Sequence, residues 1–305
     1  MLRKLFLLCC FIQSIVLQAQ HLPIYSHYFF NPLVLNPAYA GNEKGLRINS
    51  IYRKQWLGFD TEDATTPNTL SLSMDTPLRN KSSSIGTILT IDRLGVSQIT
   101  DHLFIFAQRI NLSHQSTISL GIQFGYANHR SNYSKLDLDN DPVFQDIVST
   151  TATKMGLGIN LNVSKVFISI SLPQYYFLKN QFRNNNFNPT FSTFFYSQIG
   201  YELKVNTDLY LKPNILWRYY NYQNIGNMDL NLLMYYKKNY GIGCSYRHKN
   251  ALIALLEYKF RQLSVGYAYD FSTSELRRYN SGSHEFMLRY VFHYGINAIN
   301  PKTFR

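Results

Sequence analysis

The sequence predicts an all-β fold, a transmembrane up-and-down antiparallel β-barrel of about 14 strands with both termini in the periplasm. First, segments of about ten residues alternate apolar and polar side chains along most of the chain, as amphipathic strands do. Second, aromatic residues make up 15% of the 305 residues and charged residues only 16%. Third, the long connections between the predicted strands all fall on one side of the barrel. Together these observations favour a membrane barrel over a soluble sandwich, in which the aromatic content would be lower.

The alternation is clearest in residues 240–293. Tyr240, Ile242, Cys244 and Tyr246 alternate with small or polar residues, and the pattern returns in three later segments. Applied to the whole chain, the same criterion predicts strands at 46–56, 68–76, 83–92, 99–110, 116–129, 153–162, 164–172, 191–203, 208–220, 228–237, 240–248, 251–260, 262–271 and 283–293. Segments 68–76 and 164–172 have the weakest alternation, so a count of twelve strands stays open.

The start of the chain has the features of a signal peptide. Arg3 and Lys4 form a charged beginning, an apolar run follows, and Ala19 suits a cleavage site. No later stretch contains the ~18 consecutive apolar residues of a membrane-spanning helix, so an exported membrane chain must be a closed barrel. The expected regions are a signal peptide at 1–19, a turn-rich periplasmic or plug segment at 20–45, the barrel at 46–293 and a tail at 294–305.

The cysteine content predicts that no internal disulfide stabilises the mature chain, so its fold must be held by backbone pairing alone. Cys9 and Cys10 lie in the predicted leader, so Cys244 is left without an internal disulfide partner.

The lengths of the connections predict the sidedness of the barrel. With the N-terminus in the periplasm, the long connections 130–152, 173–190 and 272–282 all lie outside the cell, and an even number of strands returns the C-terminus to the periplasm.

A proline-containing segment precedes the first predicted strand. Residues 25–41 read Tyr-Ser-His-Tyr-Phe-Phe-Asn-Pro-Leu-Val-Leu-Asn-Pro-Ala-Tyr-Ala-Gly. Proline donates no backbone hydrogen bond and restricts the residue before it, so neither a long helix nor a strand fits. The segment is either a turn-rich lead-in or an ordered segment packed in or under the barrel. We favour the packed segment, because so apolar a stretch is unfavourable in water.

Four blocks of the sequence carry a family resemblance. Residues 25–41, 53–59 (Arg-Lys-Gln-Trp-Leu-Gly-Phe), 266–270 (Gly-Tyr-Ala-Tyr-Asp) and 281–292 resemble, in order, the blocks of the PorP/SprF family of type IX secretion system outer-membrane proteins. His27 departs from the family pattern, in which glutamine is usual, and residues 61–64 replace a small turn. The resemblance implies partner or machinery contacts for the signature residues Tyr25, Asn31, Pro32, Asn36, Pro37, Tyr39, Gly41, Arg53, Gln55, Trp56 and Gly58.

The resemblance also implies a function. It suggests a non-enzymatic outer-membrane component of type IX secretion or gliding motility, without a cofactor, that helps to export or anchor a protein at the cell surface. Its implied partners are subunits of the secretion or gliding machinery, a large adhesin-like surface protein and outer-membrane lipid. The alternative is a passive diffusion porin for small solutes, which requires an open lumen.

Charge gives little support for nucleic acid as a partner. The formal net charge is +12, and it falls to +10 without the predicted leader, which holds Arg3 and Lys4 and no acidic residue. A nucleic-acid-binding protein concentrates such charge in runs within a recognisable module. Here the longest clusters are pairs such as Lys237-Lys238. Scattered cations instead fit attraction to an anionic lipid or lipopolysaccharide surface.

The faces opposite the aromatic side chains carry charged residues, which are expected to point into the lumen. Such charges either neutralise one another and keep the interior packed, or line an anion-favouring pore. The residues are Arg47, Arg53, Arg109, Arg218, Arg247, Glu257, Lys259, Asp270, Glu285 and Arg289.

Catalytic and metal sites have weak support. The eight histidines include no close ligand pair, so no metal site is expected. Ser283, His284 and Glu285 offer the residue types of a lipase, but strand neighbours face opposite sides, so His284 and Glu285 cannot form a relay. Residues 137–141 (Asp-Leu-Asp-Asn-Asp) lack the glycine and the closing glutamate of a calcium loop, so they are expected to be solvated.

Overall fold

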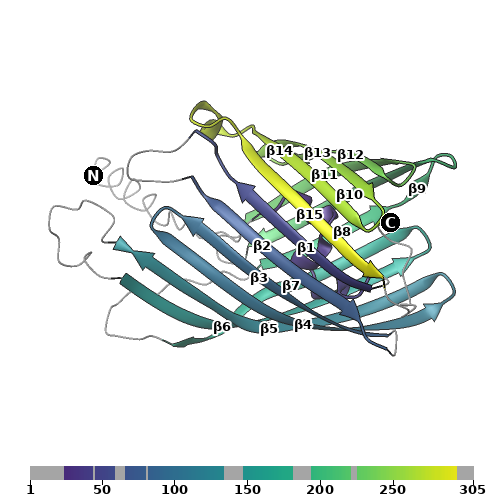
Figure 1. The fold of residues 1–305 in the computed structure, drawn as a ribbon, viewed down its shortest axis with the longest axis horizontal. Coiled ribbons are helices and arrows are strands. Elements are labelled where there is room, and N and C mark those ends of the chain that lie inside the picture. Colours follow the sequence, from purple (N-terminus) through teal and green to yellow (C-terminus); the bar gives the residue numbers. More distant parts are fainter. Residues whose placement is uncertain are drawn as a thin grey trace, which may run out of the picture.

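The protein is a barrel whose strands follow one another along the chain (Figure 1). The structure, a computed structural model, describes residues 24–43, 45–58, 66–79, 82–133, 147–180, 194–220 and 225–293. Its strands are β1 (Gly45–Lys54), β2 (Asn68–Pro77), β3 (Ser83–Leu94), β4 (Ser97–Ser113), β5 (Ser116–Asn132), β6 (Ile147–Val163), β7 (Val166–Asn180), β8 (Phe194–Tyr201), β9 (Leu203–Lys204), β10 (Leu209–Tyr220), β11 (Ile225–Tyr236), β12 (Tyr240–Arg247), β13 (Ala251–Phe260), β14 (Leu263–Ser272) and β15 (Ser283–His293). Short 3-10 turns are η1 (His27–Phe29), η2 (Pro32–Val34), η3 (Pro37–Tyr39) and η6 (Glu275–Arg278).

The first and last strands close the sheet. β1 pairs with β15 from Gly45↔His293 to Lys54↔His284, and with β2 on its other side. All neighbouring strands are antiparallel, and β9 continues the line of β8 because both pair with β10. The wall is therefore a closed barrel of 14 strand positions, which confirms the predicted count and excludes twelve.

Several strands are longer than the alternation predicts. β4, β5 and β6 each have 17 residues, against predicted ranges of 99–110, 116–129 and 153–162. At their ends, serine, threonine and asparagine interrupt the apolar pattern although the backbone pairing continues. A ladder needs only backbone groups, so side-chain alternation underestimates strand length where the wall leaves the apolar environment.

β7 continues beyond its predicted end at residue 172, because a bulge accommodates Pro173. The register of β7 against β8 shifts between Ser171 and Gln174. Proline cannot donate to a ladder, and a bulge is a position where a strand accommodates it. The Pro173 carbonyl accepts a hydrogen bond from the side chain of Gln123 on β5 instead.

Side chains alternate between the lipid-facing and lumenal faces. On β13, Leu256 and Tyr258 are exposed, while Glu257 between them is buried. Exposed apolar residues of this kind suit contact with lipid. Of the ten charged residues expected in the lumen, eight are buried, and Lys259 and Arg289 are half-buried. The predicted inward orientation is therefore confirmed.

The two ends of the barrel differ. At the end that we call the short-turn end, tight turns place Ser164, Lys237, Lys238 and Arg261 in the left-handed backbone region. β5, β7 and β14 end at the opposite end of the barrel, which we call the long-loop end because the long connections of the sequence follow these strands. β15 ends at the short-turn end, because His293 pairs with Gly45.

The expected terminal regions are mostly outside the described residues. This applies to the signal peptide at 1–19 and to the tail at 294–305. In the part of the chain that is described, no helix is long and apolar enough to cross a membrane.

The apolar core lies inside the barrel. Tyr28, Phe29 and Phe30 form one buried cluster with wall residues such as Ile51 and Leu255. In Figure 1, the purple turns of this segment are seen behind β1 and β15, enclosed by the wall.

Candidate functional site

The segment with the two Asn-Pro pairs occupies part of the lumen, and we call residues 24–42 the lumenal plug. It runs from the long-loop end, where Ser26 contacts Arg53 near the end of β1, to the short-turn end, where Gly41 contacts Asp75. Most of its side chains are buried, and that of Tyr39 is completely so. The plug is therefore part of the packed interior.

Asparagine and proline give the plug its turns. A proline opens both η2 and η3, where its missing N–H is not needed. Asn36 caps η3, since its Oδ1 accepts the Ala38 N–H at 2.8 Å, and its Nδ2 donates to Ser169 Oγ at 2.8 Å. Asn31 makes one such wall contact, from its Nδ2 to Ser73 Oγ at 3.0 Å. Each Asn-Pro pair thus turns the chain and ties it to the wall.

Two glycines of the wall receive the second Asn-Pro pair. Gly121 of β5 and Gly158 of β6 are direct cross-strand partners, and we call them the glycine notch. A Cβ at Gly121 would lie 2.3 Å from the Ala38 nitrogen, and one at Gly158 would lie 1.8 Å from Asn36 Oδ1. The plug can approach the wall this closely only because neither position has a side chain.

Asn36→Ala is expected to loosen the plug without unfolding the wall. Loss of a helix-capping side chain costs about 1 kcal/mol, which corresponds to roughly fivefold faster opening of the turn. Hydrogen exchange of a peptide that covers residues 31–41 measures this rate. Asn111→Ala, at an exposed position of β4, is the control. Equal exchange in both variants would contradict the capping role.

Charged wall residues hold the beginning of the plug. Glu285 accepts the backbone N–H groups of Ser26 at 2.8 Å and His27 at 2.7 Å, and its Oε1 lies 2.9 Å from His27 Nδ1. Arg53 donates to Glu285 at 3.0 Å and to Asp270 at 2.8 Å. All five residues are buried, so each charge depends on these neighbours for compensation. Through Arg53, the block at residues 53–59 contacts the block at residues 25–41.

Tyr28 joins a second buried network. Its hydroxyl lies 3.3 Å from Asp229 Oδ2 and 3.2 Å from Asn231 Oδ1. Arg218 and Arg247 form ion pairs with the same aspartate. Burial, and secondarily the charge of Asp229, raises the pKa of Tyr28 well above its usual value. The hydroxyl therefore remains protonated and acts as a donor.

Gly41 anchors the other end of the plug. Its N–H donates to Asp75 Oδ2 at 2.7 Å, and Asp75 Oδ1 accepts from Arg47 Nε at 2.8 Å. Arg109 donates to the Gly41 carbonyl at 3.2 Å. With φ at 70° and Ser84 where a Cβ would stand, this position requires glycine.

The signature residues Gln55, Trp56 and Gly58 lie at the rim. Trp56, with φ at 55°, donates its N–H to Ser283 Oγ at 3.1 Å, and Gly58 also has a positive φ, of 87°. These residues make the turn after β1 at the long-loop end. The side chains of Gln55 and Trp56 are half-buried. Among the described residues, Gln55, Trp56 and Gly58 are therefore not brought into contact with the plug.

Some wall positions were missed by sequence reasoning. Besides the glycine notch, Gly266 makes room for His27, since a Cβ there would lie 2.9 Å from His27 Nε2. Inward-facing strand positions mostly carry polar residues, so a glycine at such a position is the sequence signal for close approach of another segment. Nothing in the sequence pairs His27 with Glu285, because 258 positions separate them.

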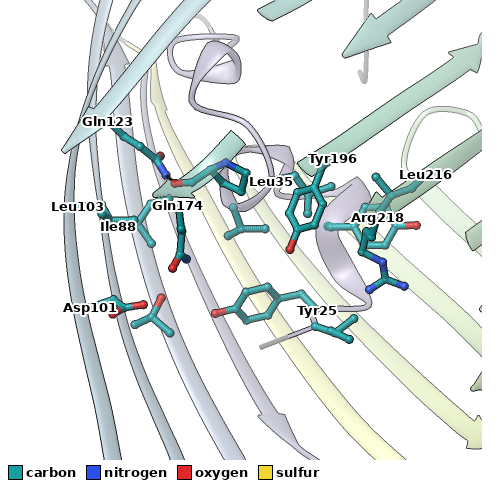
Figure 2. Close-up of a pocket in the computed structure, with 15 residues that line it drawn as sticks. Tyr25, Leu35, Ile88, Asp101, Leu103, Gln123, Gln174, Tyr196, Leu216 and Arg218 are labelled. Atoms are coloured by element: carbon teal, nitrogen blue, oxygen red, sulfur yellow. Dashed lines mark hydrogen bonds between the residues drawn. The ribbon is translucent and has the colours of Figure 1, made fainter. Parts of the chain in front are cut away.

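The long-loop half of the lumen contains a cavity beside the plug (Figure 2). Its empty space is about 640 Å³, including solvent open to it. Figure 2 shows Asp101, Gln123 and Gln174 on one side and Tyr196 and Arg218 on the other. Among the described residues, Asp101 Oδ1, Gln123 Oε1 and Arg218 Nε are buried without a hydrogen-bond partner. Such a polar cavity suits ordered water.

Ser283, His284 and Glu285 are not arranged as a catalytic relay. Glu285 faces the plug, whereas His284 contacts the Tyr267 hydroxyl at 2.7 Å on the other face of the wall. Within the described ranges, no three His, Cys, Asp or Glu side chains are grouped to hold a metal ion. Residues 137–141 lie outside those ranges.

The fold is similar to that of solved channel proteins. The P. putida toluene transporter TodX matches with a TM-score of 0.54 and 10% identity, over 87% of this chain and 94% of TodX. The monoaromatic hydrocarbon channel CymD matches with a TM-score of 0.50 and 10% identity, over 90% of this chain and 94% of CymD. At such identity, the likeness shows the barrel fold alone. No curated protein sequence matches this chain.

A family match covers nearly all of the chain. The model for the type IX secretion system membrane protein PorP/SprF matches residues 17–290. This span includes the lumenal plug, the blocks at residues 53–59 and 266–270, and most of the closing strand. The family resemblance is thereby confirmed, and the chain belongs to the PorP/SprF family.

Proposed function

We propose that this protein helps the type IX secretion or gliding apparatus to export or anchor a large adhesin-like protein at the cell surface. The observation that carries the proposal is the family match over residues 17–290. The barrel fold and the family are those of non-enzymatic membrane proteins, and both support a place in the outer membrane. Cleavage near Ala19 would release the mature chain after export.

The asymmetry of the barrel supports an orientation. Outer-membrane barrels have long extracellular loops and short periplasmic turns. We therefore propose that the long-loop end holds the surface protein, and that the short-turn end faces the periplasmic machinery. Since His293 pairs with Gly45 at the short-turn end, this orientation puts the C-terminal end of the wall on the periplasmic side.

The signature residues are proposed to act chiefly through the plug. Asn36 and Tyr39 are at most 1% exposed, so a partner cannot touch them while the plug is in place. Gln55, Trp56 and Gly58 lie at the long-loop rim, where contact with a surface protein is sterically possible. A passive porin requires an open lumen, and the packed plug favours the secretion role over that alternative.

Affinity purification from the native outer membrane tests the proposal. With a tag in the connection between β5 and β6, we expect a large surface protein or secretion-machinery subunits to co-elute in mild detergent. Deletion of the gene should abolish surface display of that protein. Isolation of the barrel alone, together with steady conductance in a planar bilayer, would instead support the porin.

A further inference from the structure

A second cavity lies at the short-turn end of the lumen. Its empty space is about 520 Å³, including solvent open to it. Phe29, Phe30 and Pro32 of the plug line one side, and residues of the wall line the other. The cavity is separate from the one at the long-loop end, since the two share no lining residue.

Positive charge predominates in this cavity. Two carboxylates, Glu43 and Glu257, face four cationic side chains: Arg47, Lys238, Lys259 and Arg289. Arg289 is paired with Glu257. Among the described residues, the ammonium groups of Lys238 and Lys259 have no carboxylate within ion-pair distance, and that of Lys238 rests 5.6 Å from the centre of the Tyr210 ring. The cavity can therefore accept additional negative charge.

Arg47 adds a buried donor without an acceptor. Its side chain is 4% exposed, and its Nε is bonded to Asp75. Its Nη2 is buried and, within the described residues, has no hydrogen-bond partner. A guanidinium presents N–H groups in the fixed geometry that a carboxylate matches. An incoming carboxylate would satisfy this donor.

We propose that this cavity binds a carboxylate of an acidic polypeptide segment on the periplasmic side. The inference rests on the proposed function for its orientation, which places the short-turn end toward the secretion machinery. Lipid is a poor candidate, because Arg47 and Lys259 point into the lumen and the wall separates them from the bilayer.

The surrounding rim adds further lysines, while Asp208 is exposed on the same rim and Glu202 is paired with Lys212. Lys204 and Lys237 are exposed beside Lys238, and their ammonium groups lie 6.0 Å and 5.3 Å from the rings of Tyr210 and Tyr236. The resulting positive field attracts a segment with several acidic residues and speeds its encounter with the cavity. A partner with a run of aspartate or glutamate fits this arrangement.

The test is binding of a fluorescent hexaglutamate peptide to the mature barrel in phosphatidylcholine nanodiscs, measured by anisotropy. We expect saturable binding that Lys238→Gln together with Lys259→Gln weakens about tenfold, because charge-assisted hydrogen bonds are lost. Lys249→Gln is the matched control, since Lys249 has a similar left-handed turn conformation, with φ at 54°, at the opposite end. Heat-modifiable gel mobility verifies that each variant is folded.

Several results would overturn the inference. These are absent binding, binding that the double variant leaves unchanged, displacement by an equal concentration of inorganic phosphate, and binding only in phosphatidylglycerol nanodiscs. Measuring the display of the partner protein on the cell surface distinguishes failure of this inference from failure of the proposed function. Normal display in the double variant, but none in a deletion strain, would overturn only the cavity's role. Normal display in the deletion strain would overturn the proposed function itself.

Discussion

Gly121→Leu is expected to displace the lumenal plug and convert the barrel into a conducting pore. The new side chain would occupy the position of the Ala38 backbone, whose nitrogen lies 2.3 Å from an added Cβ. Overpacking of this kind costs about 3 kcal/mol, which raises the displaced population roughly a hundredfold. Conductance of the purified variant in a planar bilayer measures the change.

A second variant separates plug displacement from damage to the wall. If residues 31–40 are replaced by a Gly-Ser linker, the notch has nothing to receive, and Gly121→Leu should no longer alter conductance. An increase of the same size in that background would show that the leucine distorts β5 itself. A closed barrel after Gly121→Leu would mean that the plug repacks around the new side chain.

Arg53→Ala is expected to give the largest loss of stability among single substitutions in the wall. It removes the cation that pairs with Asp270 at 2.8 Å and Glu285 at 3.0 Å, all within the buried interior. Breaking a buried ion pair by removing one partner costs about 3–5 kcal/mol. Urea unfolding in detergent micelles, followed by gel mobility, measures the loss.

Charge compensation provides the check on this prediction. Arg53→Ala combined with Glu285→Gln leaves one fewer unpaired carboxylate, so it should be more stable than Arg53→Ala alone. Arg130→Ala is the control, because Arg130 is exposed on β5. A change within about 0.5 kcal/mol is expected for such a surface substitution. Similar losses at Arg53 and Arg130 would refute the role of the buried network.

The wall of the barrel was predictable because each strand carries its own evidence. Alternation in β13, with Leu256 outward and Glu257 inward, depends only on the period of an extended chain. The even count and the sided connections then follow from closure of the sheet. The same local pattern missed the polar ends of β4, β5 and β6, where backbone pairing continues without it.

The interior was less predictable, because its contacts join residues far apart in the chain. Inward charges such as Arg53 and Glu285 could be recognised, but their alternation does not specify the ion pair between them. The Asn-Pro pairs predicted broken backbone, without indicating that Asn36 would cap η3 and bond to Ser169. These residues become neighbours only through the pairing of strands that lie far apart in the sequence.

The periodicity and the motifs of the chain alone therefore predicted the barrel and indicated its family, because those signals are local or continuous in sequence. The choice between twelve and fourteen strands required the strand pairing. The wall residues that contact the plug are determined by the closure of the barrel, which joins distant parts of the chain. Closure brings Glu285 to His27 across 258 positions, and it sets Gly121 opposite Gly158. The physical reason is that burial and charge compensation act between neighbours in space, whichever parts of the chain supply them.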